Sequence, residues 1–327
     1  MFKDRRILVT GGTGSWGYEL IKQLLPLGPA EVIVFSRNES SQVAMNRAFE
    51  DSRLSFCIGD VRDREALSKA CKDVDIIFHL AALKHVPVCE DQPYEALKTN
   101  VIGTQNVIEA AIENKVERVI NISTDKAANP SNFYGMTKAI GEKLIVYANL
   151  LRSKTKFVCV RGGNVLGTNG SVVHLFMDQI KNKNQVSITD RGMTRFFMTL
   201  EDAIRLLFKA TAQSIGGEIF VMTMPTCRII DLADVLMDAL GKRAEMVETG
   251  IRPGEKIHEI LLTEYESLST IVYDEQYLVI LPTLDVPGLR QHYASYSSVD
   301  FESFSSSQSL MNKDEIRAML ERGGFLQ

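Results

Sequence analysis

Short apolar segments alternate with longer amphipathic segments through the first half of the chain. The apolar segments are rich in valine and isoleucine and are too apolar to be half exposed. Such segments are typical of strands in a parallel sheet that is covered on both faces. The predicted strands are Ile7–Thr10, Glu31–Ser36, Leu54–Gly59, Asp75–Ala81, Arg118–Ser123 and Phe157–Arg161.

The segments between these strands have helical length and periodicity. The predicted helices are Ser15–Leu25, Glu39–Phe49, Arg64–Cys71, Tyr94–Asn114 and Tyr134–Arg152. Regular alternation of strand and helix predicts an α/β fold, a doubly wound parallel sheet with right-handed crossovers.

The regular alternation fades after Arg161. The later predicted elements are a helix over Glu201–Gln213, a strand over Glu218–Met222, a helix over Ile230–Leu240 and a last helix near Lys313–Glu321. The serine-rich stretch "YASYSSVDFESFSSSQSL" predicts a loop or an irregular crossing. We therefore expect a first domain at 1–161 and a smaller mixed α/β lobe at 162–327, with residues of about 196–223 returning to the first domain.

Composition and charge narrow the class of protein. With 45% hydrophobic and 24% charged residues among 327, the chain resembles an ordinary globular protein with ample core. The formal net charge of -4 gives no reason to expect nucleic acid or an anionic membrane surface as partner. No secretory leader and no apolar run long enough for a membrane span is visible, so we expect a cytoplasmic protein.

The cysteines give no sign of a metal site or of disulfides. They are scattered, odd in number and without a C-x-x-C pair, so we expect buried, reduced thiols and no metal. The five are Cys57, Cys71, Cys89, Cys159 and Cys227.

A glycine-rich turn follows the first predicted strand. The stretch "VTGGTGSWG" places Gly11, Gly14 and Gly17 between that strand and the opening of a helix. Glycines there allow a tight turn and close backbone approach, while the helix N-terminus offers N–H groups to a pyrophosphate. The pattern predicts a dinucleotide-binding Rossmann domain at 1–161.

The residues at the ends of the next strands indicate which dinucleotide binds. Where an acidic residue would select NAD through the ribose 2′-hydroxyl, this chain has Ser36-Arg37, and a cation there favours the 2′-phosphate of NADP. Arg37 could also be a solvated charge at a helix start. Asp60 could accept from the adenine amino group or simply cap a strand, and Ala81-Ala82 are small enough to let a cofactor lie against the backbone.

The stretch "NISTDKAANPSNFYGMTK" carries the candidate chemistry. Tyr134 and Lys138 are four residues apart, so a helix that begins at Tyr134 presents both on one face. A free phenol loses its proton only near about pH 10. An adjacent ammonium and a positive nicotinamide ring would both favour the phenolate, which could then deprotonate a substrate hydroxyl as hydride leaves its carbon.

On these residues the chain resembles the extended short-chain dehydrogenase/reductase family, in which Thr124 joins the Tyr/Lys pair. It resembles more narrowly the inverting UDP-N-acetylglucosamine 4,6-dehydratases, which open the route to pseudaminic acid, and the resemblance covers nearly the whole chain. Sugar epimerases of the superfamily lack the Thr-Asp-Lys triplet. The shared motifs are "GGTGSWG", "FSRNE", "GDVRD", "AALKHVPVCE", "TNVIGTQNV", "STDKAANP", "YGMTK", "GNVLGTNGSV", "MTRFFMT" and "RPGEKIHE".

The resemblance implies a dehydration that begins with oxidation at C4 of the sugar. A ketone at C4 makes the C5 proton acidic, so a base near C5 can remove it while an acid near O6 protonates the departing hydroxyl. Retaining relatives carry Asp-Glu where this chain has Asp125-Lys126. This difference implies a lysine base and an inverted C5, and burial beside a cation would favour the neutral amine. An exposed Asp-Lys surface pair is the alternative.

The resemblance also implies where the ligands bind. It assigns NADP to Gly11, Thr13, Gly14, Ser15, Trp16, Gly17, Ser36, Arg37, Asp60, Val61, Ala81, Ala82, Lys84, Asn100, Tyr134 and Lys138. It assigns the UDP-sugar to Lys84, His85, Asn164, Ser171, Arg195, Arg252 and Glu255. Arg252 to Glu255 also reads independently as a rigid turn that presents a guanidinium and a carboxylate to phosphate and ribose. His85 could equally be a packed turn residue.

Two other functions are compatible with the sequence, and three residues differ from those common in the family. A UDP-sugar 4-epimerase would need only Thr124, Tyr134 and Lys138, and a scaffold protein could keep NADP without catalysis. Relatives often carry a lysine, an aromatic residue and a proline at the positions of Ser41, Gly162 and His174. The family forms dimers and often hexamers, so we expect a homo-oligomer.

Overall fold

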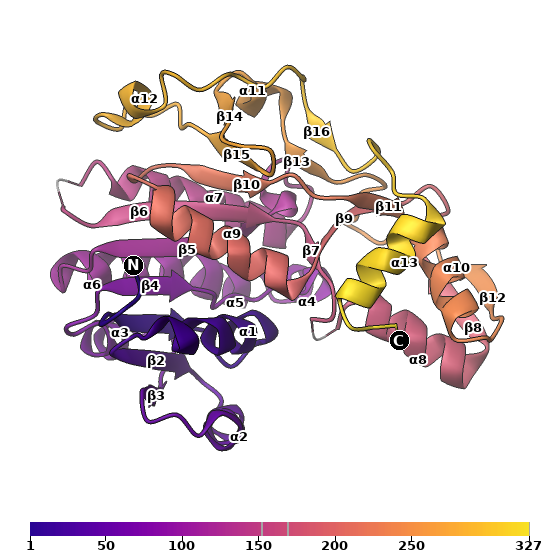
Figure 1. The fold of residues 1–327 in the computed structure, drawn as a ribbon, viewed down its shortest axis with the longest axis horizontal. Coiled ribbons are helices and arrows are strands. Elements are labelled where there is room, and N and C mark those ends of the chain that lie inside the picture. The colour runs from indigo at the N-terminus through magenta and orange to yellow at the C-terminus, as the bar shows by residue number, and fades with distance from the viewer. Residues whose placement is uncertain (152, 169, 327) are drawn as a thin grey trace.

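A computed structural model describes residues 1–151, 153–168 and 170–326. Its centre is a nine-stranded sheet with the order β14-β15-β10-β6-β5-β4-β1-β2-β3 (Figure 1). The first six strands of the chain are parallel to their neighbours, which confirms the doubly wound α/β fold. They are β1 (Arg6–Thr10), β2 (Glu31–Ser36), β3 (Leu54–Ile58), β4 (Ile76–His79), β5 (Arg118–Thr124) and β6 (Lys156–Gly162).

The apolar strands are buried between two layers of helices, with one exception. On one face α1 contacts α9, and on the other α6 contacts both α3 and α7 (Figure 1). The exception is β3, which forms the edge of the sheet and leaves Ile58 60% exposed. The apolar sequence of β3 predicted a strand covered on both faces, and the structure shows a partly exposed edge strand. The helices are α1 (Ser15–Leu24), α2 (Glu39–Phe49), α3 (Arg64–Ala70), α6 (Gly103–Glu113), α7 (Phe133–Ala148) and α9 (Leu200–Gln213).

Two predicted helices differ from the structure. The helix predicted to reach Arg152 ends at Ala148, and Arg152 itself lies outside the described residues. The single helix predicted over Tyr94–Asn114 is interrupted by a wider turn, and a further short helix precedes it. Pro87 and Pro93 lie in the first turns of the two short helices, where a missing N–H costs nothing. The pieces are α4 (Val86–Asp91), α5 (Pro93–Leu97), the π turn Lys98–Ile102 and α6.

The second half of the chain extends the sheet and builds the smaller lobe. β10 (Ile219–Met222) pairs in parallel with β6, and β15 (Tyr277–Ile280) and β14 (Thr270–Val272) continue antiparallel. Residues 270–280 thus join the sheet beyond the predicted returning segment. The lobe lies to the right in Figure 1 and has its own apolar core. It contains β7 (Asn164–Val165), α8 (Val172–Lys183), β8 (Gln185–Ile188), β9 (Thr194–Met198), β11 (Thr226–Arg228), α10 (Ile229–Ala239), β12 (Glu245–Glu248) and α13 (Lys313–Arg322).

The remaining elements cross between these two parts. The serine-rich stretch predicted as a loop contains a short strand, β16, which pairs antiparallel with β13. These connecting elements are β13 (Ile260–Leu262), α11 (Glu264–Ser267), α12 (Leu289–His292) and β16 (Phe304–Ser305). Within the described residues no helix is both long and apolar enough to cross a bilayer.

The topology fixes where a ligand can bind. The strand order reverses between β1 and β4, and the carboxyl ends of parallel strands meet at one edge of a sheet. Thr10, His79 and Thr124 end β1, β4 and β5 at that edge. The glycine turn and the Thr-Asp-Lys triplet are therefore neighbours in space.

Candidate active site

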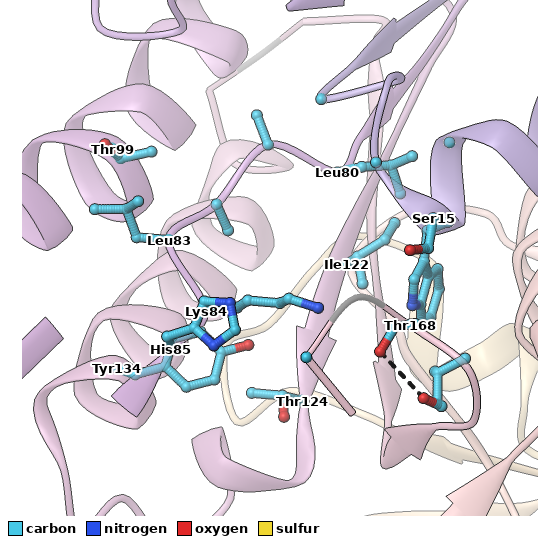
Figure 2. Close-up of a pocket in the computed structure, with 18 of the residues that line it drawn as sticks. Ser15, Leu80, Leu83, Lys84, His85, Thr99, Ile122, Thr124, Tyr134 and Thr168 are labelled. Carbon is cyan, nitrogen blue, oxygen red and sulfur yellow. Dashed lines mark hydrogen bonds between the residues drawn. The ribbon is translucent and has the colours of Figure 1, made fainter. Parts of the chain in front are cut away.

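A cavity of about 720 Å³ lies along this edge, between the sheet and the smaller lobe. Lys84, His85 and Tyr134 lie on one side of it, and Ser15 and Thr168 lie on the other (Figure 2). Most of the predicted site residues line it together. They are Gly11, Thr13, Gly14, Ser15, Trp16, Gly17, Ser36, Arg37, Asp60, Val61, Ala81, Ala82, Lys84, His85, Thr124, Lys126, Tyr134, Lys138, Asn164 and Ser171.

The glycine turn has the shape of a dinucleotide cradle. Gly11 has φ of 68°, and a Cβ there would lie 2.8 Å from the Cα of Ala81. Gly14 caps α1 without a side-chain hydrogen bond, and the first turn of α1 has no acidic residue. The positive end of this helix dipole therefore faces the cavity unopposed by a local carboxylate.

At the far end of the cavity Arg37 is available to a ligand. Its side chain is 58% exposed, and its Nη1 atom is 3.9 Å from Asp60 Oδ2. Asp60 is held more closely by Arg62, which donates to the same oxygen at 2.6 Å. The hydroxyl of Ser36 is buried and accepts from Gln42 Nε2 at 3.0 Å.

Asn100 is predicted to bind the cofactor but lies behind the cavity. Its amide accepts from the backbone N–H of Leu83 at 2.8 Å and donates to Leu83 O at 2.9 Å. It also donates to Thr137 Oγ1 at 3.0 Å. Asn100 therefore joins α7 to the loop that carries Ala82 and Lys84.

Helix α7 brings Tyr134 close to the triplet. A Cβ on Gly135 would lie 2.3 Å from the carbonyl oxygen of Lys126, so only glycine allows this approach. Asn132 caps the helix by accepting from Gly135 N at 2.8 Å. The sequence placed Tyr134 at the helix start, and the structure agrees to within one residue.

The surroundings shift the pKa values of Lys138 and Tyr134 in opposite directions. Burial lowers the pKa of Lys138 to about 8, with Cys159 and Glu142 opposing the shift. Burial and the carboxylate of Asp125 raise the pKa of Tyr134, while hydrogen bonding with Thr124 opposes that rise. The predicted shift toward phenolate is therefore not produced by these protein groups alone.

The Thr-Asp-Lys triplet forms one hydrogen-bonded chain. Thr124 Oγ1 donates to Asp125 Oδ1 at 2.8 Å, and Lys126 Nζ donates to the same oxygen at 3.0 Å. Lys126 Nζ also donates to Asn164 Oδ1 at 3.2 Å. Asp125 is fully buried and the Lys126 side chain is 18% exposed, so this is not the exposed surface pair that the sequence left open.

Three residues predicted to bind the UDP-sugar, Arg195, Arg252 and Glu255, do not line this cavity. Arg195 Nη1 donates to the carbonyl oxygens of Thr194 at 2.7 Å and Ile257 at 3.1 Å. Arg252 is 58% exposed, with its Nη1 atom 3.9 Å from Glu255 Oε1. Contact of these residues with a substrate stays a prediction.

Sequence reasoning missed several residues of the site. Thr168, Gly170, Val172, Val173 and Phe197 also line the cavity. Glu259 is buried directly behind Lys126 and belongs to the recognised motif "RPGEKIHE". The motif could have drawn attention to Glu259, whereas the lining residues carry no chemical signal of their own.

Comparison with known proteins agrees with this geometry. The profile of the family described as "Polysaccharide biosynthesis protein" matches residues 7–281. The chain belongs to this family. The chain is also 43% identical to an inverting UDP-N-acetylglucosamine 4,6-dehydratase of Campylobacter jejuni, over 87% of this chain and 85% of that one. The resemblance to that group within the extended short-chain dehydrogenase/reductase family is thereby confirmed.

Other proteins similar to this chain carry different names. A UDP-glucose 4-epimerase of Rickettsia rickettsii is 40% identical over 100% of this chain and 98% of its own. The solved structure of Pen from Bacillus thuringiensis has a TM-score of 0.94 and 37% identity, with both chains fully covered. A dTDP-glucose 4,6-dehydratase of Streptomyces venezuelae with NAD bound has a TM-score of 0.71 and 26% identity, over 77% of this chain and 86% of that one.

Proposed function

We propose that this protein is an NADP-dependent, C5-inverting UDP-N-acetylglucosamine 4,6-dehydratase. One observation carries the proposal: Thr124, Asp125 and Lys126 form a buried hydrogen-bonded chain beside Tyr134. A redox pair of tyrosine and lysine can oxidise a sugar, and an adjoining acid–base pair can then eliminate water. The 43% identity with an enzyme of that name supports the same reading.

The described residues fit a nicotinamide dinucleotide. The close approach of Gly11 to Ala81 and the uncapped N-terminus of α1 suit a pyrophosphate. We assign the 2′-phosphate to Arg37, which selects NADP over NAD. When bound, NADP accepts hydride from C4 of the sugar and returns it to C6.

Tyr134, Lys138 and Thr124 serve the oxidation at C4. Tyr134 takes the proton of the C4 hydroxyl, and Thr124 holds the phenol in place by a hydrogen bond. Lys138 is one helical turn along α7 and stabilises the phenolate electrostatically. Burial raises the pKa of Tyr134, so the phenolate would need both this ammonium and the positive nicotinamide ring.

Lys126 and Asp125 serve the elimination. With a ketone at C4, Lys126 removes the proton from C5, and the hydroxyl on C6 leaves as water with a proton supplied by Asp125. A proton that comes from solvent, not from Lys126, then adds to C5 on the opposite face and inverts that centre. The shared hydrogen bond gives the pair a direct path for the proton that one side chain gains and the other loses.

The UDP-sugar lies next to these residues in the smaller-lobe half of the cavity. We assign contacts with the sugar to Lys84, His85, Asn164 and Ser171, which all line it. We keep Arg195, Arg252 and Glu255 as the UDP-binding set. The assignment of these three rests on the family resemblance, because they do not line the cavity.

A UDP-sugar 4-epimerase is the second candidate function. It is supported by the full-length relative of that name, and it would use Thr124, Tyr134 and Lys138 alone. The buried Asp125–Lys126 pair would then have no chemical role. Because burying a charged pair is costly, we rank this candidate below the dehydratase.

NMR of the reaction with UDP-N-acetylglucosamine in heavy water tests the proposal. A dehydratase gives a 4-keto-6-deoxy product that is lighter by one water, carries deuterium at C5 and has inverted C5. An epimerase gives a product of unchanged mass without deuterium at C5. Either that result or recovery of unchanged substrate with NADP bound would rule out the dehydratase.

We propose further that the protein is a cytoplasmic homo-oligomer, a dimer or a hexamer. Met136, Ile140 and Tyr147 on α7 are each 45% or more exposed. Their spacing places them on one side of that helix, where a second copy of the chain could cover them.

A further inference from the structure

Glu259 is a buried carboxylate behind the Asp125–Lys126 pair, and no step above uses it. The residue is 4% exposed. Its Oε1 atom is 3.8 Å from Lys126 Nζ and 3.8 Å from Arg195 Nε. Within the part of the chain that the structure describes, its Oε2 atom has no hydrogen-bond partner. A buried carboxylate is costly unless neighbouring cations compensate it, so its position needs a reason.

The serine-rich stretch holds Glu259 in that position. The backbone N–H of Glu259 donates to Ser306 Oγ at 2.9 Å, and Ser306 N donates back to Glu259 O at 2.8 Å. The Ser306 hydroxyl also lies 2.7 Å from Thr194 Oγ1, next to Arg195. Ser306 is itself fully buried. A segment that the sequence left without a function thus fixes both Glu259 and the strand that carries Arg195.

The two cations next to Glu259, Arg195 and Lys126, are held to different extents. Arg195 Nη1 donates hydrogen bonds to two backbone carbonyl oxygens, so its guanidinium is a fixed counter-charge. Lys126 reaches the cavity wall, where its ammonium is shared by Asp125, Asn164 and Glu259. A long, flexible lysine side chain that donates to two acceptors and lies 3.8 Å from a further carboxylate has little rotational freedom left.

We propose that Glu259 is the positioning residue of Lys126: its carboxylate holds the ammonium at the cavity wall between Asp125 and Asn164, in the place from which Lys126 meets C5 of the sugar. The contact of Lys126 with C5 rests on the proposed function, whereas the hold of Glu259 on Lys126 does not. The charged and titratable groups that face Lys126 and Glu259 are Asp125, Tyr134, Arg195 and Lys256.

Chemical labelling of Lys126 tests the hold without any substrate. A limiting acylating reagent reacts faster with an amine that is free to meet it, so mass spectrometry of the Lys126 peptide at one fixed pH gives a labelling rate. In Glu259→Gln that rate should rise by about threefold or more, because the side chain is released from one of the groups that hold it. Glu264→Gln, the same change at an exposed position five residues along, should leave the rate unchanged. An unchanged rate in Glu259→Gln overturns the proposal.

Turnover tests the consequence for the reaction. With UDP-N-acetylglucosamine in heavy water, Glu259→Gln should lose at least about tenfold in deuterium exchange at C5. Reduction of NADP by the sugar in a single turnover should stay within about twofold, because Tyr134 and Lys138 are untouched. Equal losses in both steps would mean a general structural defect and would overturn the positioning role.

The two measurements separate the two proposals. If the wild-type protein never acts on this sugar, but labelling of Lys126 is faster in Glu259→Gln, the proposed function is wrong and the hold of Glu259 on Lys126 stands. If Glu259→Gln does not fold, Glu259→Asp takes its place. The shorter carboxylate lies farther from Lys126, so the labelling rate should rise by less, and an unchanged rate contradicts the hold.

Discussion

The ammonium of Lys126, which lines the cavity, and the carboxylate of Asp125, which is fully buried and does not line it, share a 3.0 Å hydrogen bond. Adjacent residues rarely meet through their side chains in an extended segment, because successive side chains point to opposite faces. Here β5 ends at Thr124, and the 3₁₀ turn Asp125–Ala127 brings the two side chains together. The chain thus places its proposed acid and base at one point.

The first prediction concerns Lys126 itself. Lys126→Ala should lower release of the 4-keto-6-deoxy sugar by at least about 100-fold, because no other described amine bonds Asp125 at the cavity. NADP affinity, measured by titration calorimetry, should stay unchanged. Lys143→Ala removes an exposed lysine from α7 and serves as the control. Turnover of Lys126→Ala at the wild-type rate would show that the base is another group.

The second prediction isolates the oxidation step. Tyr134→Phe removes only the hydroxyl, and single-turnover absorbance should show cofactor reduction slowed by about 100-fold or more. The ring still fills its space next to Thr124, so the melting temperature should fall by only a few degrees. Unimpaired hydride transfer in this variant would remove Tyr134 from the mechanism.

Local patterns predicted the sheet and most of the cavity well. Apolar strands and the glycine turn follow from rules that act within about ten residues, and the reversal of strand order then brings Gly11, Ala81 and Thr124 to one edge. For the same reason the stretch proposed to be catalytic could be recognised from the sequence alone. Tyr134, Lys138 and the triplet lie within fifteen residues of one another along the chain.

Long-range contacts could not be predicted in this way. Glu259 meets Lys126 across 133 positions and is anchored by Ser306, in a stretch whose composition indicated only a loop. The π turn Lys98–Ile102, which interrupts the predicted helix, contains Asn100, whose side chain hydrogen bonds to Leu83 in another loop. In both cases the residues hydrogen bond outside their own segment, and local sequence preference does not predict such contacts.

The third prediction concerns cofactor choice. Arg37→Ala should weaken NADP binding by about tenfold or more and leave NAD binding nearly unchanged, because only NADP carries the 2′-phosphate that a guanidinium can bind. Fluorescence titration with both reduced cofactors measures this ratio. Arg47→Ala, at an exposed arginine on the following helix, should change neither affinity. Equal losses for the two cofactors would contradict the NADP assignment.

The fourth prediction concerns a buried ion cluster beneath α7. Arg161 is 1% exposed and donates to Glu142 and Glu266, each at 2.7 Å. Arg161→Met leaves two carboxylates without their cation and should lower the free energy of unfolding by about 3 kcal/mol or more. Arg64→Met breaks an exposed pair with Glu109 and should cost less than about 1 kcal/mol. Urea unfolding compares the two, and similar costs would show that the buried cluster is not a major source of stability.

The fifth prediction follows from His79, which ends β4 and is 2% exposed. Its ring is 2.8 Å from Thr10 Oγ1 and 3.2 Å from Thr104 Oγ1. Burial, with a smaller contribution from the charge of Lys138, lowers the pKa of His79 from 6.5 to about 3. Between these two values the unfolded chain binds the proton and the folded chain does not. The stability that His79 contributes is therefore present above pH 6.5 and is lost as the pH falls toward 3.

Urea unfolding at a series of pH values measures this loss. In the wild type the contribution of His79 to the free energy of unfolding should fall by about 1.4 kcal/mol for each pH unit below 6.5. His79→Gln can still hydrogen bond to the threonines but takes up no proton, so its stability should depend less steeply on pH by that amount. His292→Gln, at an exposed histidine, should keep the wild-type slope. An unchanged slope in His79→Gln would mean that this histidine titrates alike in both states, and the loss at low pH would then belong to other groups.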